Sequence, residues 1–306
     1  MSLQIVFLGT GGSVPTVERS LPAIALRRKG ELILFDCGEG VQRQMVRASL
    51  GLNRKMKVFI THMHGDHVLG LPGLIQTMSL LDRTKVLEIY GPTGLEDFIE
   101  AIEKTVRFTL TFPLEVAEVE HEGLICEETE YEVYAAWTDH SAPGLAYGFV
   151  EKPRPGRFYP DKAKALGVPE GVLWSKLQHG ERIKMKGKAV EPEDVIGPAR
   201  PGRKIVYTGD SRSSKGLVKL AKKADLLIHD CTFDDDLAER AEEDGHSTPS
   251  QAAQTAKKAG ARRLILTHIS ARYKTTDMLL KQAKKTFPNV NVAEDFMEIS
   301  LPLPES

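Results

Sequence analysis

The 306-residue sequence contains only three cysteines, and no two of them form a CxxC pair. Cys37, Cys126 and Cys231 are therefore expected to be structural thiols, which argues against a disulfide framework or a thiolate zinc site. No apolar run approaches the roughly 18 residues that a membrane span requires, so a soluble protein without a membrane partner is predicted. The opening residues carry no basic stretch before their first apolar run. No signal peptide is expected, and the predicted location is cytoplasmic.

The chain also has almost no net charge, since its formal net charge at pH 7 is -1. The charges are unevenly distributed, however. Between Lys152 and Lys188 ten Lys and Arg residues stand against three acids, a local balance of +7 that leaves -8 for the remainder. Phe158, Tyr159 and Trp174 lie between these basic residues. Such a segment is typical of a surface that binds polyanions, with a solvated surface loop as the alternative.

Short apolar runs that end in a histidine or an aspartate recur along the chain and predict buried strands. They are VFITH, AAWTDH, KIVYTGD, DLLIHD and RRLILTH, which end at His62, His140, Asp210, Asp230 and His268. Helical patterns such as GLEDFIEAIEKTV and PSQAAQTAKKAG separate them, so the predicted fold class is α/β. The opening hairpin patterns favour mixed sheets. Because pockets in α/β proteins lie beyond the carboxyl ends of strands, these polar residues are expected to share one cleft.

The densest group of ligand-type residues is HMHGDH, at positions 62 to 67. His62 and His64 lie two residues apart, so both can face one point in an extended segment. Asp66 and His67 follow the flexible Gly65 and can turn toward a second point. Imidazole and carboxylate ligands without thiolates suit a catalytic zinc site, with manganese or iron as alternatives.

The pattern HxHxDH resembles the signature of the metallo-β-lactamase superfamily. The whole chain resembles the ribonuclease Z family within it, through FLGTGGSVPT, DCGEGVQRQ, GVPEGVLWSKLQHGE and GHSTPSQAA. The resemblance implies a single domain over residues 1–306, built as an αβ/βα four-layer sandwich. It also implies that residues 152–188 form an inserted flexible arm that grips tRNA.

Two zinc ions that share one carboxylate are a further implication of the resemblance. The implied ligands are His62, His64 and His140 for one ion, Asp66, His67 and His268 for the other, and Asp210 as the bridge. Two such ions can activate a water and stabilise both oxygens of a phosphodiester displacement. Asp66 would also orient that water or accept its proton.

His246 is a candidate catalytic residue outside the ligand set. Ser247 and Thr248 are candidate helix caps, Pro249 suits a first helical turn, and Gly260 suits a stop, so His246 should precede a helix. A histidine there can bind a phosphate oxygen or protonate the leaving 3′ oxygen, while a loop histidine fixed by the cap is the alternative.

Four further features carry smaller expectations. Asp230 stands where the family often has a glutamate, and whether it orients His246 stays open. The neighbouring His229 is interpreted as structural. Asp36 could fix a ligand histidine or belong to a plain turn. The GTGG of residues 9–12 lacks the P-loop and dinucleotide patterns, so we expect a tight turn beside the metal cleft.

The predicted function is that of a zinc-dependent endoribonuclease that removes 3′ trailers from precursor tRNA and leaves a 3′ hydroxyl. The resemblance also implies a homodimer. One alternative is a metallo-hydrolase of small esters or cyclic phosphodiesters, because the superfamily fold supports many hydrolases. Another is an RNA-binding protein with a structural metal, which is disfavoured because seven candidate ligands exceed the four of a closed zinc site.

Overall fold

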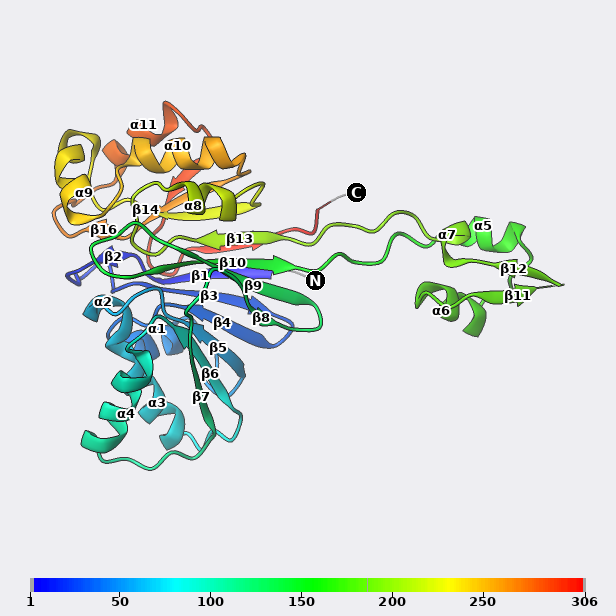
Figure 1. The fold of residues 1–306 in the computed structure, drawn as a ribbon, viewed down its shortest axis with the longest axis horizontal. Helices are drawn as coiled ribbons and strands as arrows, with labels where there is room; N and C mark the ends of the chain where they lie inside the picture. The colour runs from blue at the N-terminus through cyan, green and yellow to red at the C-terminus, as the bar shows by residue number, and fades with distance from the viewer. Residues whose placement is uncertain (1–2, 186, 305–306) are drawn as a thin grey trace. The chain divides into compact units, whose positions relative to one another are not determined.

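The computed structural model describes residues 3–185 and 187–304, and the chain divides into two compact units (Figure 1). The first unit comprises residues 3–150 and 204–302. The second comprises residues 151–203 together with 303–304. The candidate metal ligands all belong to the first unit, and the basic segment belongs to the second.

Within the described residues the first unit contains two seven-stranded sheets. The strands of the N-terminal sheet are, in spatial order, β18 (Glu298–Leu301), β1 (Leu3–Gly9), β3 (Ala23–Arg28), β4 (Glu31–Phe35), β5 (Lys55–Phe59), β6 (Leu87–Gly91) and β7 (Leu114–Glu118). The pairs from β18 to β4 are antiparallel, and those from β4 to β7 are parallel. The hairpins at the start of the chain thus produce a mixed sheet, as predicted.

The second sheet carries the other predicted strands. In spatial order these are β17 (Val290–Val292), β15 (Leu264–Thr267), β14 (Leu226–Asp230), β13 (Lys204–Tyr207), β10 (Leu145–Glu151), β9 (Tyr131–Trp137) and β8 (Gly123–Glu127). The strands β13, β14 and β15 run parallel, so their carboxyl ends share one edge. A short parallel pair, β2 (Gly11–Gly12) with β16 (Ile269–Ser270), forms a small sheet of its own.

Helices cover the outer faces of the two sheets (Figure 1). Those beside the N-terminal sheet are α1 (Val41–Arg47), α2 (Gly65–Val68), α3 (Gly70–Leu80) and α4 (Leu95–Thr105). Those of the second half are α8 (Lys215–Leu220), the 3₁₀ helix η1 (Asp235–Leu237), α9 (Ala238–Asp244), α10 (Pro249–Ala259) and α11 (Asp277–Lys284). The helices predicted from GLEDFIEAIEKTV and PSQAAQTAKKAG are confirmed as α4 and α10.

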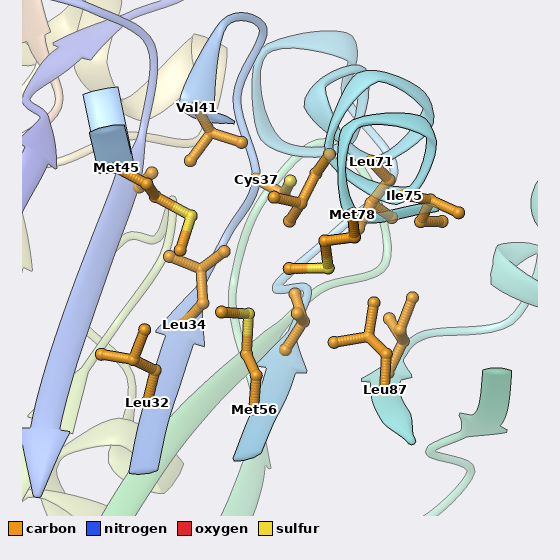
Figure 2. Packing of buried hydrophobic residues seen from close by; sticks show 14 of the residues in the cluster. Leu32, Leu34, Cys37, Val41, Met45, Met56, Leu71, Ile75, Met78 and Leu87 are labelled. Atoms are coloured by element: carbon orange, nitrogen blue, oxygen red, sulfur yellow. The ribbon is translucent and has the colours of Figure 1, made fainter. Parts of the chain in front are cut away.

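Three apolar layers hold this four-layer sandwich together. Along β1, Leu3, Ile5 and Phe7 face the layer between the sheets, whereas Val6 and Leu8 face the helices, as the two-residue period of a strand requires. Figure 2 shows the layer between the N-terminal sheet and its helices, in which side chains of β4, β5 and β6 pack against those of α1 and α3. The αβ/βα architecture predicted from the sequence is confirmed.

One strand differs from the prediction of burial on both faces. From Tyr131 to Ala135 the residues of β9 alternate between buried and partly exposed side chains, because β9 lies beside the edge strand β8 and only one of its faces enters the layer between the sheets. The parallel strands β14 and β15 are buried throughout, as predicted. None of the helices in the described ranges combines the length and apolarity that a bilayer crossing needs.

The second unit has a hydrophobic core of its own. Its elements are α5 (Pro160–Ala165), α6 (Val172–Gln178), β11 (Ile183–Met185), β12 (Lys188–Val190) and α7 (Pro192–Val195). Val190 and Val195 complete a core with Ala163, Val168 and Leu177, so the unit extends beyond the predicted end at Lys188. Lys186, one of the ten basic residues of the predicted arm, lies outside the described residues.

Candidate metal centre

The seven candidate ligands lie on segments that follow strands of both sheets, and these segments bring them close together. His62 follows β5, His140 follows β9, Asp210 follows β13 and His268 follows β15. An isolated bridge between His62 and Gly144 joins the segment after β5 to the residue that precedes β10 of the other sheet. The sandwich therefore brings together residues that lie far apart in the sequence.

The local conformation of HMHGDH explains how one short motif contributes side chains to two groups of potential metal ligands. His64 is extended, with φ -65° and ψ 145°, and α2 begins at the next residue, Gly65. The helical turn redirects Asp66 and His67 away from the direction that His62 and His64 face. The structure places these pairs in two different groups of potential ligands, as the spacing predicted.

The first group contains His62, His64, His140 and Asp210, and the second contains Asp66, His67 and His268. In the first, Nε2 of His62 lies 2.9 Å from Nδ1 of His64, and Nε2 of His140 lies 3.3 Å from the same atom. In the second, Nε2 of His268 lies 3.4 Å from both Nε2 of His67 and Oδ2 of Asp66.

Asp210 lies between the two groups. Its Oδ2 is 3.7 Å from Nε2 of His62 and 3.9 Å from Nε2 of His140. The same oxygen is 3.4 Å from Nε2 of His67 and 3.2 Å from Nε2 of His268. One carboxylate thus reaches histidines of both groups, which is the geometry that a bridging ligand requires.

The ring nitrogens that face away from the pocket have partners that fix the histidine tautomers. Nδ1 of His67 donates to Oδ2 of Asp36 at 2.7 Å, so Asp36 holds a candidate ligand and does not merely form a turn. Nδ1 of His140 donates to the carbonyl oxygen of Gly245 at 2.8 Å. When the ring is neutral, as it must be to bind a metal ion, each donation leaves the lone pair of Nε2 free for the cation. The role of Gly245 was not foreseen, because a backbone carbonyl has no signal in the sequence.

The donor set fits a divalent cation. Oδ1 of Asp210 is buried and has no hydrogen-bond partner among the described residues, an unsatisfied acceptor that a metal ion would compensate. Burial, together with the neighbouring charge of His67, lowers the pKa of His62 to about 2, which keeps its imidazole neutral and able to ligate. The three cysteines are buried and free, and they take no part in either group.

Electrostatics also keep the bridging carboxylate ionised. Burial alone would raise the pKa of Asp210, but the charges of His268 and His67 hold that pKa well below its usual range. Burial alone would also raise the pKa of Asp66, but its hydrogen bond with His268 outweighs burial and lowers that pKa. Both carboxylates are therefore ionised and available as ligands at neutral pH.

The GTGG segment was expected to form a tight turn, but it runs from the end of β1 into the short strand β2, which pairs with β16 beside His268. A Cβ at Gly12 would lie 2.5 Å from a ring carbon of His268, so this position admits only glycine without a shift of the ligand. The next backbone N–H, that of Ser13, donates to Oδ2 of Asp66 at 2.8 Å. This segment thus packs closely against one candidate ligand, His268, and donates a hydrogen bond to another, Asp66.

His246 lies at the same pocket, just before α10. Thr248 caps the helix and forms a capping box with Gln251, and Gly260 ends it with φ 64°, as the sequence predicted. Oδ2 of Asp230 lies 2.9 Å from Nδ1 of His246, which answers the question that the sequence left open. The shorter aspartate does reach the histidine.

Burial alone would lower the pKa of His246, but the charge of Asp230 and its hydrogen bond outweigh burial and raise the pKa to about 9. The ring also lies within ligand distance of Asp210 and His268, so these three residues form a further potential metal group. His229, in contrast, is buried in β14, where its Nδ1 bonds to the backbone carbonyl oxygen of Asp230, in keeping with a structural role.

A pocket of about 470 Å³ opens onto these residues. It is lined by His64, Asp66, His140, Asp210 and His246. Ser141, Phe233, Arg240 and Arg272 lie around it. Its polar lining and its place at the strand ends suit a charged substrate that approaches a metal centre.

Two protein-family models match parts of the chain. Residues 169–269 match the family model described as "Beta-lactamase superfamily domain". Residues 3–106 match the model described as "Anti-Pycsar protein Apyc1". Each model covers only part of the chain.

Full-length relatives are more informative. The chain is 51% identical to Ribonuclease Z of Methanosarcina acetivorans and 48% identical to Ribonuclease Z of Methanosarcina mazei, with 98% of both chains covered in each case. Among solved structures it is similar to human tRNase Z, short form, with a TM-score of 0.73 and 34% identity. That similarity covers 98% of this chain and 100% of the human one.

Proposed function

The chain belongs to the ribonuclease Z family of the metallo-β-lactamase superfamily, and on that premise we propose how its metal centre acts. It is an endoribonuclease that hydrolyses phosphodiester bonds in the processing of tRNA 3′ ends. Relatives named Ribonuclease Z, at 43 to 51% identity over nearly the full chain, support this assignment. The expected cut removes the 3′ trailer from precursor tRNA and leaves a 3′ hydroxyl.

The observation that carries the mechanism is the position of Asp210, whose Oδ2 lies within 4 Å of histidines from both ligand groups. We propose two zinc ions with Asp210 as their bridge. The proposed ligands of one ion are His62, His64 and His140, and those of the other are Asp66, His67 and His268. Imidazole and carboxylate donors without cysteine suit an open, catalytic zinc site.

When bound, the ions supply Lewis acidity that activates a water and stabilises the charge on the phosphate oxygens. Asp66 has a second task, because its Oδ2 is held by the N–H of Ser13 while the carboxylate faces the pocket. From there it orients the attacking water and accepts a proton from it. Its lowered pKa keeps it in the ionised form that can accept hydrogen bonds.

His246 is proposed as the general acid. The ring lines the pocket, and Asp230 accepts the proton of Nδ1, so the proton available for transfer is the one on Nε2. The raised pKa of His246 keeps the ring protonated at neutral pH. As the water oxygen bonds to phosphorus, the bond between phosphorus and the 3′ oxygen breaks, and His246 donates its proton to that oxygen. The products are a tRNA with a 3′ hydroxyl and a trailer with a 5′ phosphate.

The second unit is proposed as the tRNA grip. Arg157, Lys162, Lys176, Lys184 and Lys188 are exposed on it. Two of its aromatic residues, Phe158 and Trp174, pack against the unit's own core. Trp174 packs beside Phe158 at the unit's own core, and its indole N–H donates to the carbonyl oxygen of Val168. Basic side chains that neutralise phosphates would therefore supply the affinity.

We also propose that the protein is a homodimer located in the cytoplasm, where tRNA precursors are its partners. Leu69, at the start of α3, and Leu80, at its end, both have exposed side chains and lie eleven positions apart. Leu81, the next residue, is exposed as well. Eleven residues are close to three helical turns, so the first two lie on one face and offer apolar surface to a second copy. Light scattering should give twice the chain mass of 33.8 kDa. A single-chain mass at micromolar concentration would contradict the dimer.

Incubation with a 3′-extended precursor tRNA, with and without a chelator, tests the function directly. Mapping of the product ends should show one cut at the 3′ side of the acceptor stem, abolished by the chelator and restored by zinc. Turnover of a small chromogenic phosphodiester without any cut in the precursor would favour the small-substrate hydrolase. Binding of the precursor without cleavage would favour an RNA-binding protein with a structural metal.

A further inference from the structure

Thr232 lies two residues beyond the end of β14, and its hydroxyl touches three functional side chains at once. Its Oγ1 is 2.6 Å from Oδ1 of Asp230 and 2.8 Å from Nδ1 of His268. It is also 3.1 Å from Nδ1 of His246. The side chain is only 5% exposed, so water does not compete freely for these contacts.

Donor and acceptor capacity determines the direction of each bond. A threonine hydroxyl has one proton, and an ionised carboxylate only accepts, so the proton of Thr232 is donated to Asp230. The oxygen of Thr232 must then accept the Nδ1–H of His268. That tautomer leaves the Nε2 lone pair of His268 for the pocket, where it lies 3.2 Å from Oδ2 of Asp210.

The other oxygen of the same carboxylate serves His246. Oδ2 of Asp230 accepts the Nδ1–H of His246 at 2.9 Å. A single Asp230 carboxylate therefore fixes the proposed acid directly and, through the Thr232 hydroxyl, fixes a proposed metal ligand. The rings of His246 and His268 stack, with centroids 5.2 Å apart and an interplanar angle of 22°.

We propose that Thr232 is a positioning residue that couples the general acid to the metal centre by holding His268 and Asp230 in one hydrogen-bonded unit. This assignment rests on the function proposed above. Without the hydroxyl, Nδ1 of His268 loses its acceptor and Oδ1 of Asp230 loses its donor. Both the metal ligand and the acid would then lose orientation.

The chain contains a second example of the same arrangement. Oγ1 of Thr61 donates to Asp36 and lies 3.0 Å from Nδ1 of His62, while Asp36 accepts from His67. Here too, one threonine and one buried aspartate orient two rings of the centre. The fold therefore uses a threonine hydroxyl with a buried aspartate at two separate pairs of histidines to orient their rings.

Three variants test the proposal. Thr232→Val keeps the shape and removes the hydroxyl, Thr232→Ser keeps the hydroxyl, and Thr255→Val is the matched control. Thr255 is also a fully buried threonine, and its hydroxyl, on α10, bonds to that of Ser213 at 2.7 Å, away from the ligand set. All three are measured for zinc affinity by chelator competition, for thermal unfolding, and for single-turnover cleavage at saturating zinc.

Thr232→Val should weaken zinc binding about 10- to 100-fold, the range for losing a partner that orients a ligand. At saturating zinc it should still slow cleavage at least about 10-fold, because the acid is misoriented as well. Thr232→Ser should restore both quantities to within a few fold of the parent protein. Thr255→Val should change neither, although it too lowers the unfolding temperature.

The zinc measurement needs no RNA, so it separates a failure of this proposal from a failure of the proposed function. Parent-like zinc affinity and cleavage in Thr232→Val would overturn the proposal. A change in only one of the two would show that the hydroxyl serves one histidine and does not couple them. A Thr232→Ser protein as impaired as Thr232→Val would show that a hydroxyl at this position does not suffice, and would overturn the proposal.

Discussion

Nδ1 of His67 lies 2.7 Å from Oδ2 of Asp36, and both side chains are fully buried. Asp36 also accepts hydrogen bonds from the hydroxyl of Tyr207 at 2.8 Å and from the backbone N–H of Thr61 at 2.7 Å. The carboxylate thus ties a candidate metal ligand to the strands of both sheets. The orientation of His67 depends on a residue that is not itself a candidate ligand.

Asp36→Asn should therefore weaken zinc binding about 10- to 100-fold, because the amide cannot accept from every donor that Asp36 satisfies. The backbone at this position is left-handed, with φ 56°, and asparagine tolerates this conformation. The substitution therefore adds no backbone strain that could itself change zinc affinity. Chelator competition measures the affinity.

Tyr207→Phe is the matched control, since it removes one hydrogen bond to Asp36 and leaves the bond to His67. It should cost about 1 kcal/mol of unfolding free energy and leave zinc affinity unchanged. Equal zinc affinities for Asp36→Asn and the parent protein would show that Asp36 does not position His67.

Replacement of His246 by alanine separates an acid from a metal ligand. As an acid, its loss should slow single-turnover cleavage of precursor tRNA about 10²- to 10⁴-fold while the zinc content stays unchanged. Because His246 also forms a potential metal group with Asp210 and His268, zinc must be measured on the same sample. A loss of zinc in parallel with activity would make His246 a ligand, and an unchanged rate would make it structural.

The salt dependence of tRNA binding tests the second unit. Replacing Lys162, Lys176 and Lys184 with alanine should weaken precursor binding and flatten the slope of log affinity against log salt by roughly 0.7 to 0.9 for each phosphate that is no longer neutralised. These side chains are exposed, so the unit's core should persist. Hydrolysis of a small chromogenic phosphodiester should not change.

The control for this test is a pair of exposed lysines on α10, Lys257 and Lys258, changed to alanine. They lie in the last turn of the helix, at the end opposite its N-terminal cap, and their removal should leave the salt slope as in the parent. A proportional loss of both activities in the Lys162, Lys176 and Lys184 variant would show that the second unit shapes the active site.

A partly buried ion pair between Lys57 of β5 and Glu128, which follows β8 of the other sheet, predicts one part of the acid sensitivity of the fold. The side chain of Lys57 is 3% exposed, and its Nζ lies 2.9 Å from a carboxylate oxygen of Glu128. Burial alone would raise the pKa of Glu128, but hydrogen bonds from Lys57 and Lys55 lower that pKa below its usual value. A carboxylate with a depressed pKa stabilises the fold above its unfolded pKa, and this contribution is lost as the pH falls through the folded pKa.

Glu128→Gln should accordingly lower the free energy of unfolding at pH 7 by no more than about 1 kcal/mol, because solvent screens a carboxylate that is partly exposed. The difference from the parent should shrink below about pH 4.3, where glutamate protonates in the unfolded chain. Urea unfolding at several pH values measures this difference. Glu115→Gln, an exposed change on β7, should show no such pH dependence. A difference that stays constant down to about pH 3 would exclude the ion pair as its source.

Much of the fold follows from local patterns. The runs that end at His62, Asp210 and His268 are strands because apolar, β-branched stretches cannot be left exposed, and the capping signals around Thr248 place α10 to the residue. The clustering of the candidate ligands could be predicted for the same reason. Strand ends on one edge of a sheet meet in space, so polar residues there can be assigned to one pocket.

Other features depend on contacts that no local pattern records. Gly245 supports His140 through a carbonyl oxygen, and Thr232 acts through a hydroxyl that could equally have faced solvent. The second unit extends past Lys188 because Val190 and Val195 close its core, whereas charge alone suggested an earlier end. The inward packing of Trp174 follows from the same core and was not visible in the spacing of the aromatic residues.

The most direct test of the two-metal mechanism is a zinc titration of metal-free protein, followed by cleavage of a 3′-extended precursor tRNA at each step. Because Asp210 contacts both ligand groups, neither ion should suffice alone, and cleavage should reach its plateau near two zinc ions per chain. The product should end in a 3′ hydroxyl at the 3′ side of the acceptor stem. Full cleavage at one zinc ion per chain would contradict the two-metal centre.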